Sequence, residues 1–257
     1  MTIIFNGRAD AGATIASYEW VEAARADSIT VVNAPRNAGP MFRFSSKQSD
    51  DIVHGDWRAE LSVSTIVEAP FSENWFYFDV LMESSGLPDG MRKGIICQMH
   101  SVDTGPESYG REPPFALDVH LRQFLNVESR FDANATSTAD PQTVTSEVLA
   151  GYPLRAMFDR VVPIVLRIRW DFGVTGLLQM WVDHHPVIDR VSPIGFNDAQ
   201  GPYPKIGIAH CQHGNSNGSD NEIVIYNSGM KVGDSTSSYY EMTGRHPYPW
   251  SATRATQ

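Results

Sequence analysis

Residues 164–183, IVLRIRWDFGVTGLLQMWVD, decide the fold class of this chain. Apolar and polar residues alternate from Ile164 to Phe172, which is the period-two pattern of a half-buried β-strand. Two glycines then interrupt the pattern, and a second apolar run follows from Leu177 to Asp183. The stretch therefore predicts a β-hairpin.

Strand signals continue on both sides of this hairpin. Short apolar runs at 76–82 and 222–226 predict two further strands, and residues 115–127 alternate over what we expect to be one long strand. On that strand His120 and Arg122 would share the polar face. Helical signals are weak and confined to 11–26 and 146–150. The sequence predicts an all-β fold: a concanavalin A-like β-jelly roll sandwich of two antiparallel sheets with a concave substrate cleft, forming a single domain over residues 1–257.

Composition limits the partners of the chain. A formal net charge of -10 over 257 residues argues against binding to nucleic acid or to anionic membranes. A polyanionic substrate would therefore need a local basic site. Cys97 and Cys211 are too few for a disulfide scaffold, and we expect two free, buried thiols. The N-terminal residues lack a signal peptide, and no apolar stretch approaches the ~20 residues needed to cross a bilayer.

Three short segments, 57–61, 94–100 and 203–210, carry most of the chemically capable groups. Each segment, as a strand, would turn its polar residues to one face and its apolar residues to the other. If the strands share a sheet, the polar faces would form a solvent-exposed cleft, and the apolar faces would lie in the hydrophobic core. The polar sets are Arg58 and Glu60, then Gln98 and His100, then Tyr203, Lys205 and Gly207.

These motifs resemble those of the jelly-roll polysaccharide lyases, which include alginate lyases, glucuronan lyases and the heparin lyase I group. The matching elements are Arg-x-Glu-Leu at 58–61, Gln-x-His at 98–100 and Tyr-x-Lys-x-Gly at 203–207, within a motif-bearing core of about residues 40–235. The resemblance implies an enzyme that cleaves a uronic-acid polysaccharide by β-elimination. It also implies an extracellular or periplasmic location. Because this sequence shows no signal peptide, release by cell lysis, for example of a phage product, is one route by which the protein could reach that location. Ser62 stands where alginate lyases often carry a second arginine, so glucuronate-type polymers or bacterial exopolysaccharides are expected ahead of alginate.

The resemblance also assigns roles to individual residues. Arg58 and Gln98 would neutralise the substrate carboxylate through charge-assisted hydrogen bonds, and Glu60 would orient Arg58. His100 would remove the proton, because its pKa lies near neutrality. Lys205 would hold a substrate carboxylate or hydroxyl group.

The catalytic acid is the open point, because the tyrosine that commonly follows the motif glycine by two residues is replaced here by Ala209. Tyr203 is the first candidate for this role, and His210 is another if a bulge turns it inward. Further candidates that could reach the cleft from loops are Tyr109, Tyr152, Tyr239 and Tyr240.

Other polar groups have weaker assignments. His120 and Arg122 would bind sugar subsites or lie in solvent. We predict no metal ligand among the histidines and cysteines, because none of them shows metal-ligand spacing. No cofactor is required, although a structural calcium ion could bind to oxygen ligands from Asp50, Asp51 and Asp220. Two alternative functions stay open: a noncatalytic carbohydrate-binding module on the same fold, and a glycoside hydrolase, for which no carboxylate pair is evident.

Overall fold

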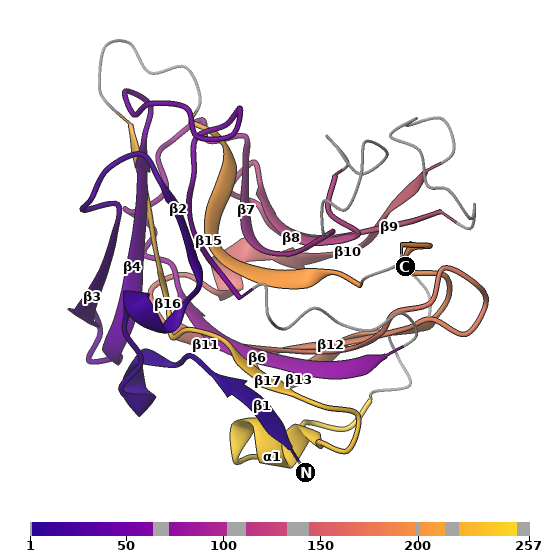
Figure 1. Cartoon of the computed structure of the whole chain (residues 1–257). Coiled ribbons are helices and arrows are strands. Elements are labelled where there is room, and N and C mark those ends of the chain that lie inside the picture. The colour runs from indigo at the N-terminus through magenta and orange to yellow at the C-terminus, as the bar shows by residue number, and fades with distance from the viewer. Residues whose placement is uncertain are drawn as a thin grey trace.

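The computed structural model describes residues 2–63, 72–101, 112–132, 144–198, 201–213 and 221–250. Its regular elements are almost all β-strands, arranged in two sheets that stack face to face (Figure 1). The predicted all-β jelly-roll fold is confirmed. No helix in these ranges is long and apolar enough to cross a membrane.

The first sheet has nine strands and contains the predicted hairpin. Ile164 of β11 pairs with Val182 of β12 in an antiparallel ladder. The strands, in spatial order, are β13 (His185–Val191), β12 (Leu177–Val182), β11 (Val161–Arg169), β6 (Glu73–Leu81), β16 (Glu222–Asn227), β4 (Gly39–Lys47) and β3 (Ile29–Ala34), with β17 (Lys231–Gly233) pairing both β6 and β1 (Ile3–Asn6).

The second sheet has eight strands and bends, so that its concave side faces away from the first sheet (Figure 1). We call this side the concave face. In spatial order the strands are β10 (Thr145–Pro153), β9 (Phe124–Asp132), β8 (Phe115–His120), β7 (Lys93–His100), β15 (Tyr203–Gln212), β5 (Ala59–Ser62) and β2 (Trp20–Ala23), with the short β14 (Gly195–Phe196) pairing β9 in parallel.

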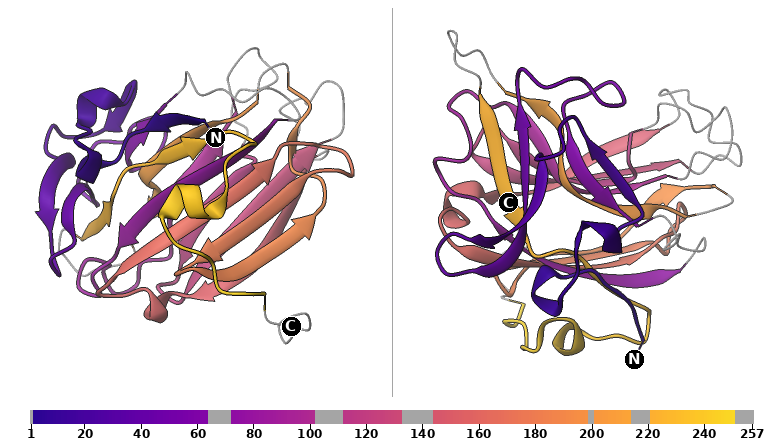
Figure 2. Two further views of the ribbon diagram at one scale, coloured as in Figure 1. Left: turned by 90° about the horizontal axis from the view of Figure 1, so that it is seen from below. Right: turned by 60° about the vertical axis from the view of Figure 1, so that its left-hand side comes forward.

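The expectation of a helical turn within 11–26 is confirmed in part, and that at 146–150 is wrong. Residues 11–26 contain the 3-10 turn η2 (Ile15–Ser17), but Trp20–Ala23 pairs with β5 as a strand. Residues 146–150 belong to β10, which pairs with β9. Pairing with a neighbouring strand outweighs a weak local signal in both places. The remaining helical elements are η1 (Ala9–Ala11), η3 (Leu154–Ala156) and α1 (Tyr239–Thr243), and α1 lies over the outer face of the nine-stranded sheet (Figure 2).

The single strand expected over 115–127 is also wrong. A turn at Leu121 and Arg122, with φ values of 51° and 54°, divides it into the β8–β9 hairpin, in which His120 pairs with Phe124. Leu121 is 47% exposed and lies outside the core. Alternation alone did not reveal the turn, because the apolar residues on both sides of it stay in phase.

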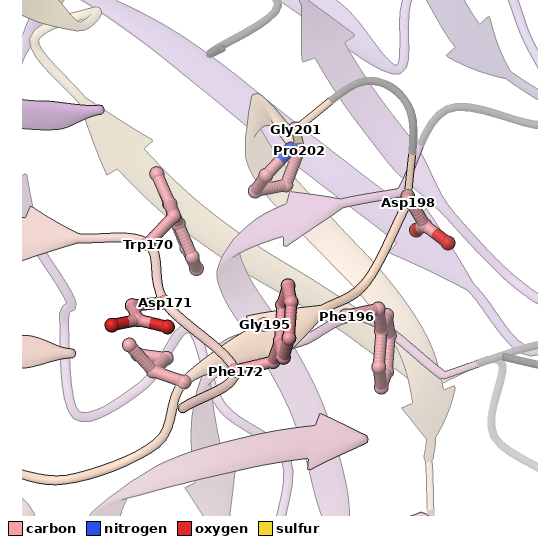
Figure 3. A pocket seen from close by; sticks show the side chains of 9 residues that line it. Trp170, Asp171, Phe172, Gly195, Phe196, Asp198, Gly201 and Pro202 are labelled. Atoms are coloured by element: carbon pink, nitrogen blue, oxygen red, sulfur yellow. The ribbon is translucent and has the colours of Figure 1, made fainter. Parts of the chain in front are cut away.

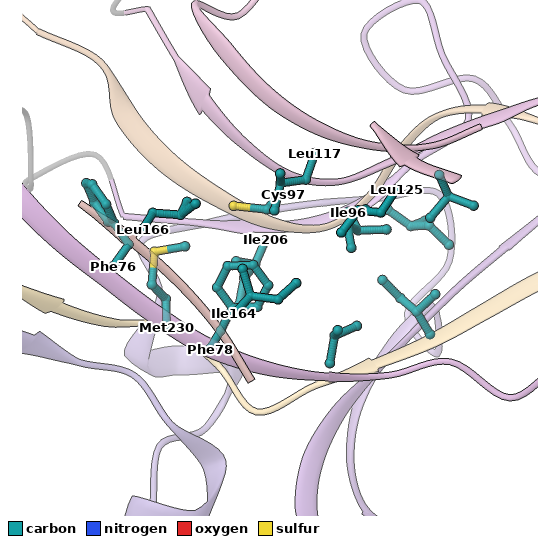
Figure 4. Packing of buried hydrophobic residues seen from close by; sticks show 14 of the residues in the cluster. Phe76, Phe78, Ile96, Cys97, Leu117, Leu125, Ile164, Leu166, Ile206 and Met230 are labelled. Atoms are coloured by element: carbon teal, nitrogen blue, oxygen red, sulfur yellow. The ribbon is translucent and has the colours of Figure 1, made fainter. Parts of the chain in front are cut away.

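The two sheets share one hydrophobic core (Figure 4). Phe76, Phe78 and Ile164 from the nine-stranded sheet pack with side chains such as Cys97 and Ile206 from the other sheet, all with at most 1% of their surface exposed. Both cysteines are buried and free, as predicted. Burial raises the pKa of both thiols, which keeps them protonated and unreactive.

Candidate active site on the concave face

The three segments that carry the motifs lie side by side on β7, β15 and β5. Tyr203 of β15 is directly opposite His100 of β7. Lys205, two residues on, lies opposite Gln98 on one side and Ser62 on the other. Directly opposed residues point to the same face, so these polar groups converge on the concave face while the residues between them enter the core.

Strand β2 adds a fourth set of groups, which the sequence did not reveal. Glu22 lies opposite Glu60 of β5. Its carboxylate accepts a hydrogen bond from Lys205 Nζ at 2.7 Å and another from Arg58 Nη1 at 2.8 Å. Glu22 therefore holds two cations that come from different strands of the sheet.

Glu60 lies at the bottom of the cluster and is 1% exposed. It accepts a hydrogen bond from Gln98 Nε2 at 2.7 Å, and Arg58 Nη1 is 3.4 Å away. Burial raises the pKa of Glu60, and the opposing charges of Lys205 and Arg58 do not cancel this effect. Glu60 therefore holds a proton more tightly than an ordinary glutamate does.

Glu22 behaves in the opposite way. Burial opposes its ionisation, but the charges and hydrogen bonds of Lys205 and Arg58 outweigh burial and hold the pKa of Glu22 below its ordinary value. Arg58 and Lys205 thus bring two positive charges to the concave face, beside the carboxyl groups of Glu22 and Glu60. A polyanionic substrate would need such cations on a chain of net charge -10.

Tyr203 and His100 form an aromatic pair beside this cluster, with ring centroids 5.7 Å apart. His100 Nδ1 is 2.8 Å from the carbonyl oxygen of Ser101. A carbonyl oxygen only accepts, so Nδ1 carries the proton and Nε2 is the nitrogen that can take one up. Lys205 Nζ lies 5.8 Å from the centre of the Tyr203 ring.

Arg58 immediately precedes β5, at the end of that strand remote from Ser62. Since Ser62 is the residue opposite Lys205, Arg58 lies further along the sheet from Tyr203 than Lys205 does. Its guanidinium bonds to Glu22, Glu60 and the backbone oxygen of His54. The structure therefore brings Arg58 to the carboxylates, and it brings Lys205 and Gln98 to the Tyr203–His100 pair.

The two weaker candidates, His120 and Arg122, lie away from this cluster. His120 ends β8, and its Nδ1 is 3.7 Å from Asp118. Arg122 lies in the following turn, where it pairs with Asp89 and donates to the backbone oxygen of Ser84. The expectation that the two share one strand face is therefore wrong.

His210 occupies the bulge that the sequence reasoning considered. The β15–β7 register shifts between Ala209 and Gln212, and His210 has a φ of 50°. Its Nδ1 contacts the carboxylate of Asp56. This contact with a neighbouring segment anchors the histidine.

Most of the alternative tyrosines lie elsewhere. Tyr152 is opposite Leu125 and packs against the core. Tyr239 and Tyr240 belong to α1, on the far side of the other sheet. Tyr109 lies outside the described residues. Among the described candidates, Tyr203 is the tyrosine that faces His100.

A small pocket adjoins the start of β15 (Figure 3). Its volume of about 20 Å³ accommodates a water molecule but no sugar ring. Its lining residues are Trp170, Asp171, Phe172, Ile194, Gly195, Phe196, Asp198, Gly201 and Pro202.

The residues considered for calcium do not assemble a site in the described ranges. Asp50 accepts hydrogen bonds from Arg25 and from the backbone nitrogen of Lys47. Asp220 lies outside the described residues. The described ranges also contain no group of three or more histidine, cysteine or acidic side chains placed to hold a metal ion.

Comparison with known proteins gives a family match and a set of similar structures. The model of the family described as polysaccharide lyase matches residues 11–231. No curated protein sequence matches the chain. An endo-β-1,4-glucuronan lyase from the fungus Trichoderma reesei has a TM-score of 0.73 at 13% identity, with 94% of this chain and 98% of that chain covered. A marine PL-14 alginate lyase from Aplysia kurodai has a TM-score of 0.57 at 14% identity, with coverage of 91% and 100%. A glycoside hydrolase family 131 catalytic domain from Coprinopsis cinerea has a TM-score of 0.56 at 12% identity, with coverage of 93% and 97%.

Proposed function

This chain belongs to the polysaccharide lyase family, and from that premise we propose that it cleaves a uronic-acid-containing polysaccharide by β-elimination on the concave face. The observation that carries the proposal is the Tyr203–His100 pair beside Lys205 and Gln98. An acid, a base and two groups that can bind a carboxylate thus meet on adjacent strands. Since such polymers are found outside cells, we place the enzyme there as well.

In the proposed reaction His100 Nε2 removes the proton at C5 of the uronic acid. The electron pair of the C–H bond forms the C4=C5 double bond, and the bond from C4 to the linking oxygen breaks. Tyr203 supplies a proton to the departing oxygen, and its phenolate is then reprotonated. The products are a new sugar hydroxyl group and an unsaturated uronate, so no water is consumed.

Negative charge develops on the substrate carboxylate as the C5 proton leaves. Lys205 and Gln98 lie next to the Tyr203–His100 pair and are therefore assigned the neutralising role. Glu22 positions Lys205 through the 2.7 Å hydrogen bond. Arg58 anchors Glu22 from the other side, which shifts its role from direct neutralisation to support of this cluster.

A glucuronate-type polymer is the preferred substrate within this proposal. The Trichoderma reesei structure that resembles this chain is a glucuronan lyase, and its TM-score exceeds that of the Aplysia kurodai alginate lyase. In addition, Ser62 occupies the position opposite Lys205 where alginate lyases often carry an arginine. A bacterial exopolysaccharide that contains glucuronate satisfies the same chemistry.

The test is an absorbance assay for unsaturated uronates on glucuronan, alginate, heparin, hyaluronan and bacterial exopolysaccharides. We expect a rising signal on a glucuronate polymer and a reduction of about 10²–10⁴-fold in kcat for His100→Ala. His185→Ala is the matched control, because His185 stacks on Tyr248 at the outer side of the other sheet and should leave the rate unchanged. Shortened polymer without absorbance would contradict elimination.

That contrary result would point to the second candidate, a glycoside hydrolase. Glu22 and Glu60 are directly opposed, and their pKa values are shifted in opposite directions. Hydrolysis uses a pair of carboxyl groups that flank the scissile bond. Hydrolysis would require Glu60, so Glu60→Gln would abolish chain shortening. Membership of an enzyme family argues against the third alternative, a noncatalytic binding module.

A further inference from the structure

Trp20 is exposed to solvent, whereas its neighbours Lys205 and Tyr203 are buried. Its side chain is on β2, and 54% of its surface is accessible. By contrast, Lys205 is 3% exposed and Tyr203 is 7% exposed. Ligand sites combine aromatic side chains with a few convergent polar groups, which is the combination found here.

The strand register fixes the position of Trp20 relative to the proposed catalytic groups. Trp20 lies opposite Ser62, which in turn lies opposite Lys205, so all three share the concave face. The Trp20 ring meets the Tyr203 ring edge-on, with centroids 6.3 Å apart and an angle of 72° between the planes. The indole is thus oriented beside the residue that is proposed to protonate the leaving oxygen.

The chemistry of a pyranose ring complements this arrangement. Its hydroxyl and carboxylate groups lie around the edge, while its C–H groups form apolar faces. Lys205 and Gln98 can bind the polar edge, but neither offers a surface for the C–H face. An indole supplies that surface, and its electron-rich face attracts the slightly positive C–H groups.

We propose that Trp20 is a sugar-binding platform that stacks against the uronic acid residue next to the cleaved bond. The identity of the polymer rests on the proposed function, whereas the binding of a sugar at Trp20 does not depend on elimination. Strand β2 then contributes twice to the site, because Glu22 holds Lys205 and Trp20 holds a neighbouring sugar.

Two residues provide matched controls. Val21 is the next residue on β2, is 50% exposed and lies opposite Leu61, on the other side of the strand. Val21→Ala therefore reports any loosening of this edge strand. Trp250 is 45% exposed, and its ring lies 6.0 Å from that of Trp181 on the nine-stranded sheet. Trp250→Ala removes a similar indole from the opposite side of the molecule.

The experiment measures binding and turnover separately. The affinity for a β-1,4-linked glucuronic acid tetrasaccharide is measured by calorimetry in an inactive His100→Ala background, and kcat and KM for glucuronan are measured in the active enzyme. We expect Trp20→Ala to weaken tetrasaccharide binding and raise KM about fivefold to tenfold, with kcat almost unchanged. Trp20→Phe should recover part of the loss, and Val21→Ala and Trp250→Ala should bind like the parent.

The outcomes separate this inference from the proposed function. If the enzyme forms unsaturated product and Trp20→Ala binds the tetrasaccharide as the parent does, the platform is wrong and the lyase stands. If no polymer yields unsaturated product but binding still depends on Trp20, the platform stands without elimination. Equal losses in Val21→Ala and Trp20→Ala would assign the effect to strand β2 as a whole and overturn the platform.

Discussion

The outer faces of the two sheets are covered by different kinds of side chain. On the nine-stranded sheet, Trp75 and Trp181 stack with centroids 5.8 Å apart, and Tyr239 of α1 closes over Trp181 at 5.2 Å. On the concave face, the corresponding layer consists of charged and amide groups around Lys205. The first face hides apolar surface under a helix, whereas the second places charges where a ligand can meet them.

Both faces leave some buried polar atoms without a hydrogen-bond partner within the described structure. On the aromatic face these are the indole nitrogens of Trp75 and Trp181. On the concave face they include Arg58 Nε, Ser62 Oγ and Gln98 Oε1. Each such atom costs roughly 1–3 kcal/mol of stability. These atoms are buried on both faces, so each face carries a cost of this kind.

The largest effect should come from breaking the aromatic face. Trp181→Ala removes a 5% exposed indole that contacts both Trp75 and Tyr239, and we expect the free energy of unfolding to fall by about 3–5 kcal/mol. Urea denaturation measures the loss. Activity per folded molecule should not change, because these rings lie across the core from Lys205. A fall in kcat in fully folded protein would show that the two faces are coupled.

The next effect comes from a pair of lysines, one for each face. Lys205→Met removes the proposed neutralising charge, and we expect kcat to fall by about 10²–10³-fold. Stability should decline by only about 1–3 kcal/mol, because Arg58 still pairs with Glu22. Steady-state kinetics on glucuronan and urea denaturation measure the two quantities.

Lys231→Met is the counterpart on the aromatic face. Lys231 Nζ donates to the backbone oxygens of Glu241 and Met242, which hold α1 in place. Lys231→Met should lower the free energy of unfolding by about 1–3 kcal/mol and leave kcat unchanged. If both lysine variants lose activity in proportion to their stability, then the special role of Lys205 is contradicted.

The fold was accessible from the sequence because its signals are local. Alternation at 164–172 and the glycines that follow it predicted the β11–β12 hairpin, and the ladder confirms it. The turn at Leu121 and Arg122 escaped detection because neither residue is a typical left-handed turn former. The strand at 20–23 was missed for a related reason: four residues at a sheet edge carry too short a pattern to identify.

The candidate site was predictable only in part. The face shared by Gln98, His100, Tyr203 and Lys205 follows from residue parity once the strands are neighbours. Glu22 could not be found in this way, because its role depends on β2 pairing with β5, a contact between distant segments. A carboxylate that holds two cations has no sequence signature of its own.

The smallest effect tests whether the charge balance of the concave face controls binding. Burial raises the pKa of Glu60, so the folded protein holds its proton more tightly than the unfolded chain does. This difference adds to the free energy of unfolding. The added stability is fully present below the ordinary pKa of glutamate, and it is lost as the pH rises through the raised pKa of Glu60 in the folded protein. Over the same rise in pH, ionisation of Glu60 adds a negative charge beside Lys205. KM for a polyanionic substrate should then increase about fivefold, which corresponds to a loss of ~1 kcal/mol in binding free energy.

Glu60→Gln keeps an acceptor for Gln98 but cannot ionise, so its KM should stay nearly constant over the pH range in which the KM of the parent rises. Glu73→Gln is the control from the other sheet, where Glu73 accepts a 2.7 Å hydrogen bond from Arg167, and it should retain the slope of the parent. The measurements are KM for glucuronan and the free energy of unfolding in urea, for the parent and both variants, across this pH range. If Glu60→Gln keeps the slope of the parent, Glu60 does not set the charge that the substrate meets.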